Sequence, residues 1–336
     1  MDLWNLAIRI IFLSQTTTGI LGNLSLTFYY LVLYYRECTL KPTDLILMHL
    51  MASNALVILS AGVPHTMAVW GLKQFLNDFG CQLLLYIQRF GRSVSIGTTC
   101  LLSVFQAITI NPQGFFWKNH KFKIAKYIGC SIYLLWVFYM LINFIFFMYP
   151  FIEMNSKNVT RKRNFGYCLI VGSGEISGSL YVALIVCPEI LFSVIIIWSS
   201  SSMIVILYRH KESVRHIRSS TAFSRTSPES IATQNILALV ATFLFFYTLS
   251  SILRACIVFL YKQNWWLVNI TSITSLCFPS FGPFVLMKHY SILSRFSLVW
   301  MRNKTSDSYF KYLHDMICFI SGCLLPHNTQ KFNSES

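Results

Sequence analysis

The chain has 336 residues, of which 55% are hydrophobic and only 12% are charged, and its formal net charge is +15. A soluble domain carries roughly 25% charged residues, so this composition excludes an ordinary soluble globule, whose surface it would leave largely apolar. The basic residues stand in short runs between long apolar stretches, whereas a nucleic-acid-binding protein gathers them on one soluble face. We therefore expect a protein of the lipid bilayer with no nucleic-acid partner.

Apolar stretches of about 20 residues or more predict seven transmembrane helices. In chain order they cover residues 7–33, 44–71, 81–110, 127–149, 180–208, 231–260 and 267–287. The first is interrupted by the polar run from Ser14 to Thr18, whose hydroxyls can bond to carbonyls of their own helix. The sequence therefore predicts an all-α membrane protein, with a seven-transmembrane helix bundle over residues 1–300 and a tail over residues 301–336.

The distribution of lysine and arginine between the predicted helices indicates how the chain is oriented. Segments 34–43, 111–126, 209–230 and 288–336 together hold 17 of these residues, whereas segments 1–6, 72–80, 150–179 and 261–266 hold 6. Cytoplasmic loops carry an excess of positive charge. We therefore expect an extracellular N-terminus and a cytoplasmic C-terminus, which requires an odd number of spans.

Two of the ten cysteines face outside on this topology. Cys81 stands where the third span begins, and Cys168 lies in the loop between the fourth and fifth spans. Disulfides persist only in oxidising compartments, so we predict a Cys81–Cys168 bond, with two free thiols as the alternative. The same loop carries Asn158 in an Asn-Val-Thr tripeptide, which predicts a glycosylation site.

Four ionisable residues lie in the outer half of the predicted spans: Arg89 and Arg92 in the third, Glu189 in the fifth and Arg254 in the sixth. A charge inside a membrane is costly, so each is a functional candidate. We predict that they line a cavity whose surplus positive charge binds a small organic ligand with an anionic group, such as a sulfate or carboxylate. The alternative is structural, with Glu189 paired to one arginine and the other two reaching the interface or bonding carbonyls.

No motif for catalysis or metal binding stands out. The sequence shows no nucleophile elbow, phosphate loop or HExxH pattern, so we predict neither an enzyme nor a bound cofactor. His49 and His65 have no second ligand at metal spacing, and we predict no metal site.

Several long segments resemble the vomeronasal type 1 receptors, a pheromone-receptor family with the rhodopsin-like seven-helix fold. The resemblance runs from the first span to about residue 300 and is carried by residues 40–64, 98–112, 207–237, 246–253 and 277–287. The first of these reads LKPTDLILMHLMASNALVILSAGVP and the last CFPSFGPFVLM. The resemblance implies a plasma-membrane receptor for small-molecule chemosignals that transmits binding to an inhibitory-class heterotrimeric G protein.

The departures from the wider rhodopsin-like pattern point the same way. Gln106 stands where the common pattern has the arginine of its acidic-Arg-Tyr triplet, and Asn54 stands where a sodium-binding aspartate is usual. These departures argue against an amine or peptide receptor. We expect Gln106, with Arg209, His210 and Lys211 at the start of the third inner loop, to face the G protein.

Two other readings of the sequence remain open. A bitter-taste-type receptor also lacks the usual triplet, although segments 207–237 and 277–287 favour the vomeronasal family. A small-solute transporter or channel belongs to a different class of membrane protein. Transporters usually show repeated halves with broken helices, and this sequence shows no such internal symmetry.

Overall fold

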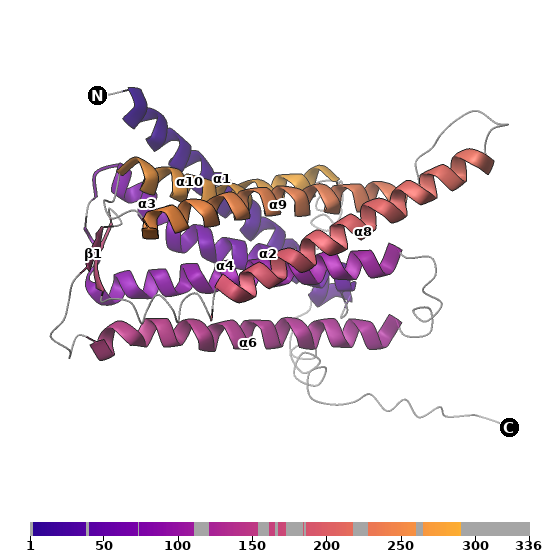
Figure 1. Ribbon diagram of the computed structural model, residues 1–336, viewed down its shortest axis with the longest axis horizontal. Coiled ribbons are helices and arrows are strands. Elements are labelled where there is room, and N and C mark those ends of the chain that lie inside the picture. Colours follow the sequence, from indigo (N-terminus) through magenta and orange to yellow (C-terminus); the bar gives the residue numbers. More distant parts are fainter. Residues whose placement is uncertain are drawn as a thin grey trace, which may run out of the picture.

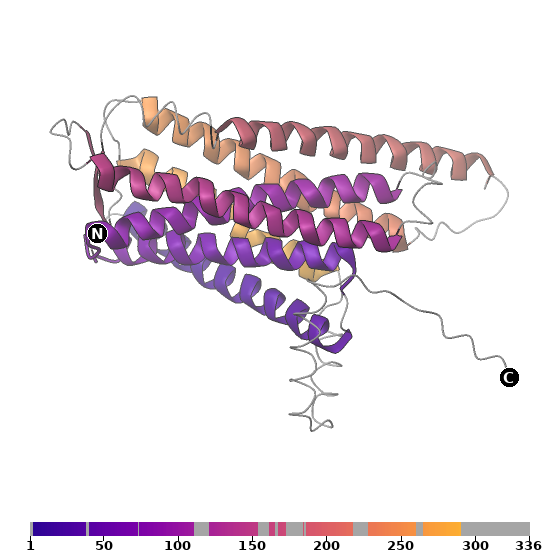
Figure 2. The same ribbon diagram turned by 90° about the horizontal axis from the view of Figure 1, so that it is seen from below.

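A computed structural model of the chain describes residues 3–37, 40–72, 74–110, 121–153, 161–164, 167–172, 184, 186–217, 228–259 and 265–289. Long helices dominate this part of the chain and run along a common direction (Figure 1; Figure 2). In chain order the elements are α1 (Leu3–Glu37), α2 (Pro42–Val57), the π-helix η1 (Ile58–Gly62), α3 (Val63–Val69), α4 (Asp78–Ile110), α6 (Lys121–Glu153), β1 (Arg161–Asn164), β2 (Leu169–Gly172), α8 (Cys187–Ile217), α9 (Pro228–Phe259) and α10 (Trp265–His289).

The described helices form seven rods, because α2, η1 and α3 follow one another without a break from Pro42 to Val69. Each rod overlaps one of the predicted spans. Within the described residues, five rods are long and apolar enough to cross a membrane; α1 and α10 are not among them. Both carry many polar side chains, in the run from Ser14 to Thr18 and between Asn269 and Ser275. The prediction of a helical membrane protein is confirmed, whereas seven crossings remain a prediction.

The surface of the bundle is apolar, as lipid requires. In helices α6, α8 and α9 only a minority of the most apolar segment is buried inside the bundle. In α2 and α4 most of it is buried, and these helices form the centre. On α8, Trp198 is 78% exposed, and on α6, Tyr133 is 69% exposed. Large exposed apolar surfaces on several helices would drive association in water. This distribution is that of a bundle surrounded by hydrocarbon.

Ser14, Thr17 and Thr18 of the polar run in α1 bond carbonyls of their own helix, as predicted, whereas Gln15 bonds α10 and Thr16 bonds Thr66 of α3. The Thr17 hydroxyl donates to the Leu13 carbonyl at 2.8 Å, and the Thr18 hydroxyl donates to the Ser14 carbonyl at 2.6 Å. The same bond to the preceding turn recurs across the bundle, for example from Thr99 to Ser95 in α4. These bonds allow hydroxyl side chains to sit in a medium that offers no water.

Helices α2 and α4 pack closely in the centre of the bundle. A Cβ atom added at Gly91 of α4 would lie 3.0 Å from the backbone carbonyl oxygen of Ser53 in α2 and 3.2 Å from the Leu56 Cβ atom. Glycine therefore permits this approach of two backbones. Farther along the same rod, the π-helical turn η1 precedes Pro64 and widens the helix by one residue.

One end of the bundle carries a β-hairpin and a disulfide, and we call it the disulfide end. Strands β1 and β2 pair antiparallel, from Arg161 opposite Gly172 to Asn164 opposite Leu169. The sequence predicts an all-α protein, so this short hairpin is an unexpected addition to the helices. It lies at the same end as the N-terminus (Figure 1). The disulfide joins Cys168, just before β2, to Cys81 in the first turns of α4, so the predicted bond is confirmed.

Candidate functional site

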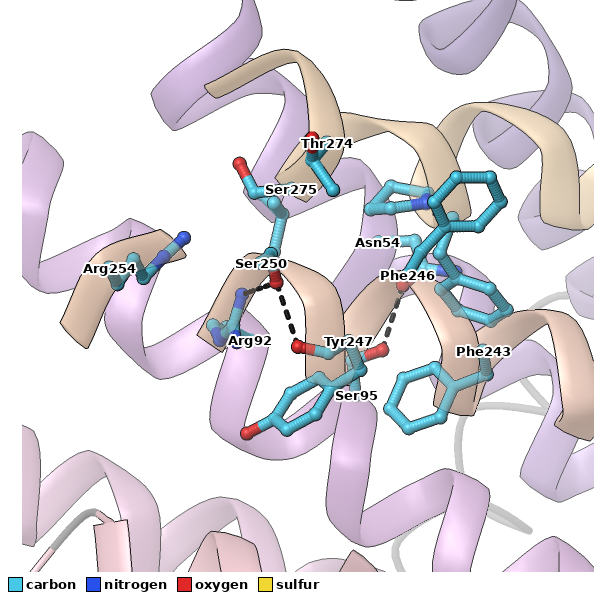
Figure 3. Close-up of a pocket in the computed structure, with 13 residues that line it drawn as sticks. Asn54, Arg92, Ser95, Phe243, Phe246, Tyr247, Ser250, Arg254, Thr274 and Ser275 are labelled. Atoms are coloured by element: carbon cyan, nitrogen blue, oxygen red, sulfur yellow. Dashed lines mark hydrogen bonds between the residues drawn. The ribbon is translucent and has the colours of Figure 1, made fainter. Parts of the chain in front are cut away.

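A small cavity lies inside the bundle between α2, α4, α9 and α10 (Figure 3). Its volume is about 30 Å³. Its polar wall consists of Asn54, Arg92, Ser95, Ser250, Arg254, Thr274 and Ser275, and its aromatic wall consists of Phe243, Phe246, Tyr247 and Phe278. Arg254 and Arg92 lie toward one end, and Asn54, Phe243 and Phe246 toward the other (Figure 3).

Arg92 of α4 is held by α9 through three contacts. Its two terminal nitrogens donate to the hydroxyls of Ser250 at 3.0 Å and Ser251 at 2.7 Å. The guanidinium carbon lies 4.2 Å from the centre of the Tyr247 ring, within the range of a cation–π interaction. A planar guanidinium can make both kinds of contact at once, so Arg92 fixes α4 against α9 in this conformation.

Glu189, in the first turn of α8, completes the surroundings of Arg92. One of its carboxylate oxygens lies 3.9 Å from Arg92 Nε, and the two side chains are only 11% and 13% exposed. A pair buried to this degree is screened much less than a surface pair, but it must overcome the desolvation of both charges. Arg92 thus links three helices, α4, α8 and α9.

Arg254 also lines the cavity, one helical turn beyond Ser250 on α9. It lies five residues before the end of α9, which ends at Phe259. Burial raises the pKa of the Tyr167 phenol, and the Arg254 guanidinium acts in the opposite direction. Arg254 and Arg92 therefore place two guanidinium groups in the wall of one cavity.

Arg89 points elsewhere. Its guanidinium carbon lies 5.9 Å from the centre of the Phe146 ring on α6, and Arg89 does not belong to the described cavity wall. Residues three apart on a helix differ in direction by about 60°, so the long side chains of Arg89 and Arg92 reach different neighbours. Of the four predicted residues, the structure brings Arg92, Arg254 and Glu189 to one region and places Arg89 against α6.

The cavity includes residues that the sequence does not predict for it, such as Asn54, Ser95 and Ser250. The Ser95 hydroxyl donates to the Asn54 side-chain oxygen at 2.9 Å, joining α4 to α2, and Ser250 accepts from Arg92 (Figure 3). One signal was available in the sequence. Arg92, Ser95 and Thr99 follow one another at positions i, i+3 and i+7, which marks a polar stripe facing the interior of the bundle.

The loop near β2 packs over the end of the bundle close to the cavity. Tyr167 and Cys168 are both 1% exposed, and the Tyr167 ring meets the His65 ring edge-on at 5.0 Å between centroids. His65 also stacks on Phe12 of α1 and shares a 3.0 Å hydrogen bond with Ser272 of α10. The disulfide therefore holds this loop segment against α3, whose His65 in turn contacts α1 and α10.

Of the remaining predicted site residues, those that the structure describes do not line this cavity. Gln106 is buried near the end of α4, at 8% exposure, and Arg209 is exposed on α8. His210 and Lys211 continue α8, but their side chains are outside the described part, as is Asn158. Among the described residues, no cluster of three or more His, Cys, Asp or Glu side chains could hold a metal ion.

Comparisons with known proteins relate the whole bundle to one family of receptors. The family described as the vomeronasal organ pheromone receptor family matches residues 6–298. Human vomeronasal type-1 receptor 2 is 45% identical over 304 residues, which are 90% of this chain and 75% of that protein. Human vomeronasal type-1 receptor 4 is 45% identical over 290 residues, 86% of this chain and 96% of that protein. The orangutan (Pongo pygmaeus) receptor 4 is 44% identical with the same coverage.

Proposed function

Because this chain belongs to the vomeronasal type-1 receptor family and is a multi-pass protein of the plasma membrane, we propose that it is a chemosensory G-protein-coupled receptor. Its ligand is a small organic molecule that carries an anionic group. Its cytoplasmic partner is a heterotrimeric G protein of the inhibitory class. The observation that carries the ligand class is the pair of guanidinium groups, Arg92 and Arg254, in the wall of one cavity.

The proposed topology has seven spans, with the disulfide end outside the cell. The Cys81–Cys168 bond supports this orientation, since disulfides persist in oxidising compartments. The excess of lysine and arginine in the segments at the opposite end supports it independently. With this orientation, Arg254 of the cavity wall lies near the extracellular end of α9, on the side from which a chemosignal arrives.

The wall of the cavity suits an amphiphilic ligand. The guanidinium groups provide charge-assisted hydrogen bonds to a sulfate or carboxylate, and the rings of Phe243, Phe246 and Phe278 provide an apolar surface for the rest of the molecule. The present volume of about 30 Å³ is roughly a tenth of the smallest usual small-molecule pocket, about 300 Å³. Binding therefore requires helices α9 and α10 to separate slightly from α2 and α4.

The proposed G-protein surface lies at the other end of α4 and α8. It comprises Gln106, Arg209, His210 and Lys211, the first buried at the end of α4 and the second exposed on α8. A neutral glutamine at position 106 cannot form the interhelical ion pair that an arginine there could form. Restraint of the resting state then falls to other contacts between helices, and we propose that the Arg92 contacts between α4 and α9 contribute to it.

The test is a reporter or calcium response in cells that express this chain with an inhibitory-class Gα subunit. The panel contains sulfated steroids, aromatic and aliphatic carboxylates, and their uncharged alcohols. We expect responses to anionic compounds, blocked by pertussis toxin. Arg254→Gln and Arg92→Met should each raise the half-maximal concentration at least about tenfold at equal surface expression, the loss of one charge-assisted contact.

A matched control is Arg9→Gln. Arg9 lies near the same end of the bundle, where its guanidinium carbon is 5.8 Å from the centre of the Trp70 ring, and it does not line the cavity. Its replacement should leave the response intact. Responses to the uncharged alcohols alone, or unchanged potency in Arg254→Gln, would disprove the anionic ligand class.

A further inference from the structure

One buried polar group in the cavity wall has hydrogen-bonding capacity that no described residue uses. Asn54 is 0% exposed, and its side-chain nitrogen has no hydrogen-bond partner in the described part of the chain. Its side-chain oxygen accepts from the Ser95 hydroxyl at 2.9 Å, which holds the amide in place while its N–H₂ group remains unused. A buried amide donor without a partner is costly, and folded proteins usually satisfy it. Asn54 therefore points to an acceptor inside the cavity.

The hydroxyl groups of the same wall offer acceptors. Ser95 donates its hydrogen to Asn54. Thr274 and Ser275 donate theirs to carbonyl oxygens of their own helix, α10, at 2.7 Å and 2.9 Å. Each of these hydroxyl oxygens keeps lone pairs that can accept from a molecule in the cavity. The wall thus combines an unused donor at Asn54 with several acceptors.

A neutral hydroxyl group fits this combination, because it accepts one hydrogen bond and donates another. It also fits the amide of Asn54 in either of its two orientations, whereas a carbonyl oxygen fits only one of them. A methylene group would leave the donor without a partner. Asn54 lies toward the end of the cavity opposite to Arg254, so the hydroxyl would lie away from any group that this arginine binds (Figure 3).

We propose that Asn54 determines specificity by binding a neutral hydroxyl group at the end of the ligand remote from its anionic group. This inference rests on the proposed function, because it takes the same cavity as the ligand site and narrows the ligand class to hydroxylated organic anions. In the unliganded receptor a water molecule replaces the hydroxyl, since the volume of about 30 Å³ exceeds the roughly 10–15 Å³ that one water requires. The ligand hydroxyl displaces this water when the helices separate and reproduces its hydrogen bonds.

The experiment uses the purified full-length protein in detergent micelles and four steroid probes. Two are steroid sulfates, one with a hydroxyl group on the ring farthest from the sulfate and one with hydrogen in its place. The other two are the same pair with an uncharged methyl ether instead of the sulfate. Thermal unfolding is followed while each probe is titrated, because a ligand that binds only the folded state raises the midpoint. We expect loss of the hydroxyl to raise the half-maximal concentration at least about tenfold, in the sulfated and the uncharged pair alike.

Two variants and a matched control assign this preference to Asn54. In Asn54→Leu, which removes the unused donor, the hydroxylated and deoxygenated probes should differ by less than about twofold. Ser95→Ala releases the amide and should also reduce the preference, so it replaces Asn54→Leu if that variant does not fold. The control is Asn143→Leu on α6. Asn143 is also 0% exposed, its nitrogen donates to the Tyr139 carbonyl at 2.8 Å, and it does not line the cavity, so this variant should retain the full preference.

Equal half-maximal concentrations for the hydroxylated and deoxygenated probes on the wild-type protein would overturn the inference. So would a preference that persists undiminished in Asn54→Leu, or the absence of stabilisation by all four probes. The proposed function fails separately. A preference for hydroxylated probes without any preference for sulfated ones would contradict the anionic ligand class and support the role of Asn54. A preference for the sulfates alone would support the anionic ligand class and overturn the role of Asn54.

Discussion

The side-chain amide of Asn23 in α1 donates a 2.7 Å hydrogen bond to the carbonyl oxygen of Pro279 in α10. In a regular helix that carbonyl would accept from the backbone N–H four residues later, but position 283 is a proline and has no N–H. Asn23, which is fully buried, supplies the missing donor from another helix. A polar residue in α1 thereby compensates for an imino acid in α10.

The first prediction concerns this compensation. Asn23→Leu should lower the free energy of unfolding by about 1–3 kcal/mol, because the Pro279 carbonyl loses its donor in a dry interior. In a Pro283→Ala background the restored backbone N–H can bond the same carbonyl, so the cost of Asn23→Leu should shrink. Thermal unfolding of the four proteins of this cycle measures the difference. Equal costs in the two backgrounds would contradict the assignment.

The second prediction concerns the charge next to Arg92. Glu189→Gln removes the carboxylate but leaves Arg92 its contacts with Ser250 and Ser251. Under the proposed function, the half-maximal concentration of an anionic agonist should fall by about 3- to 10-fold, since the local positive charge grows by one. Asp78→Asn removes the same charge at an exposed position and serves as the control. Dose–response curves at matched surface expression provide the comparison, and a loss of potency in Glu189→Gln would favour a purely structural pair.

The third prediction concerns the disulfide. Cys81→Ala, Cys168→Ala and the double variant should all lose surface expression to the same extent, because each removes the same bond. The bond closes a loop with a sequence separation of 87 residues, and loss of such a bond costs about 2–5 kcal/mol. Flow cytometry of an N-terminal epitope tag is the measurement. A double variant markedly worse than either single one would show that the thiols act separately.

The fourth prediction concerns the contact between α2 and α4. Gly91→Ala should lower the unfolding midpoint, because the new Cβ atom would press on the Ser53 carbonyl of a neighbouring backbone. Gly129→Ala on α6 is the matched change, with its nearest neighbour 4.0 Å away, and should be neutral or stabilise by up to about 1 kcal/mol. If both substitutions had the same sign and size, the close approach at Gly91 would have no energetic weight.

The hydropathy of the sequence predicts where the helices lie, but not how their polar side chains are bonded or where the hairpin forms. Each predicted span overlaps one described rod, because long apolar runs have few alternatives in lipid. Helices α1 and α10, which were also predicted as spans, are not among the five rods apolar enough to cross a membrane; their hydroxyl and amide groups bond carbonyls of the same or a neighbouring helix, as Thr18 and Asn23 show. The hairpin near Cys168 gave no comparable signal, since its strands are only four residues long.

The candidate site could be predicted only in part, for a related reason. Charged residues in apolar spans are conspicuous, so Arg92 and Arg254 were found directly from the sequence. Their partners were not, because Ser250 and Ser251 look like any other hydroxyls in a span and meet Arg92 only once α4 and α9 are packed. The contact of Arg89 with the Phe146 ring of α6 could not be predicted either, because the two residues are far apart in the sequence.

The π-helical turn at Ile58–Gly62 changes the directions in which the side chains beyond it point. One surplus residue per turn rotates everything beyond it by about 100° relative to an uninterrupted α-helix. The far segment thereby aims the imidazole of His65 at Phe12 and Ser272 and the hydroxyl of Thr66 at Thr16, 2.9 Å away. Deleting Leu59 alone would therefore give a regular α-helical turn and leave both side chains facing α1 and α10, whereas straightening the turn without a deletion would rotate them away from these helices.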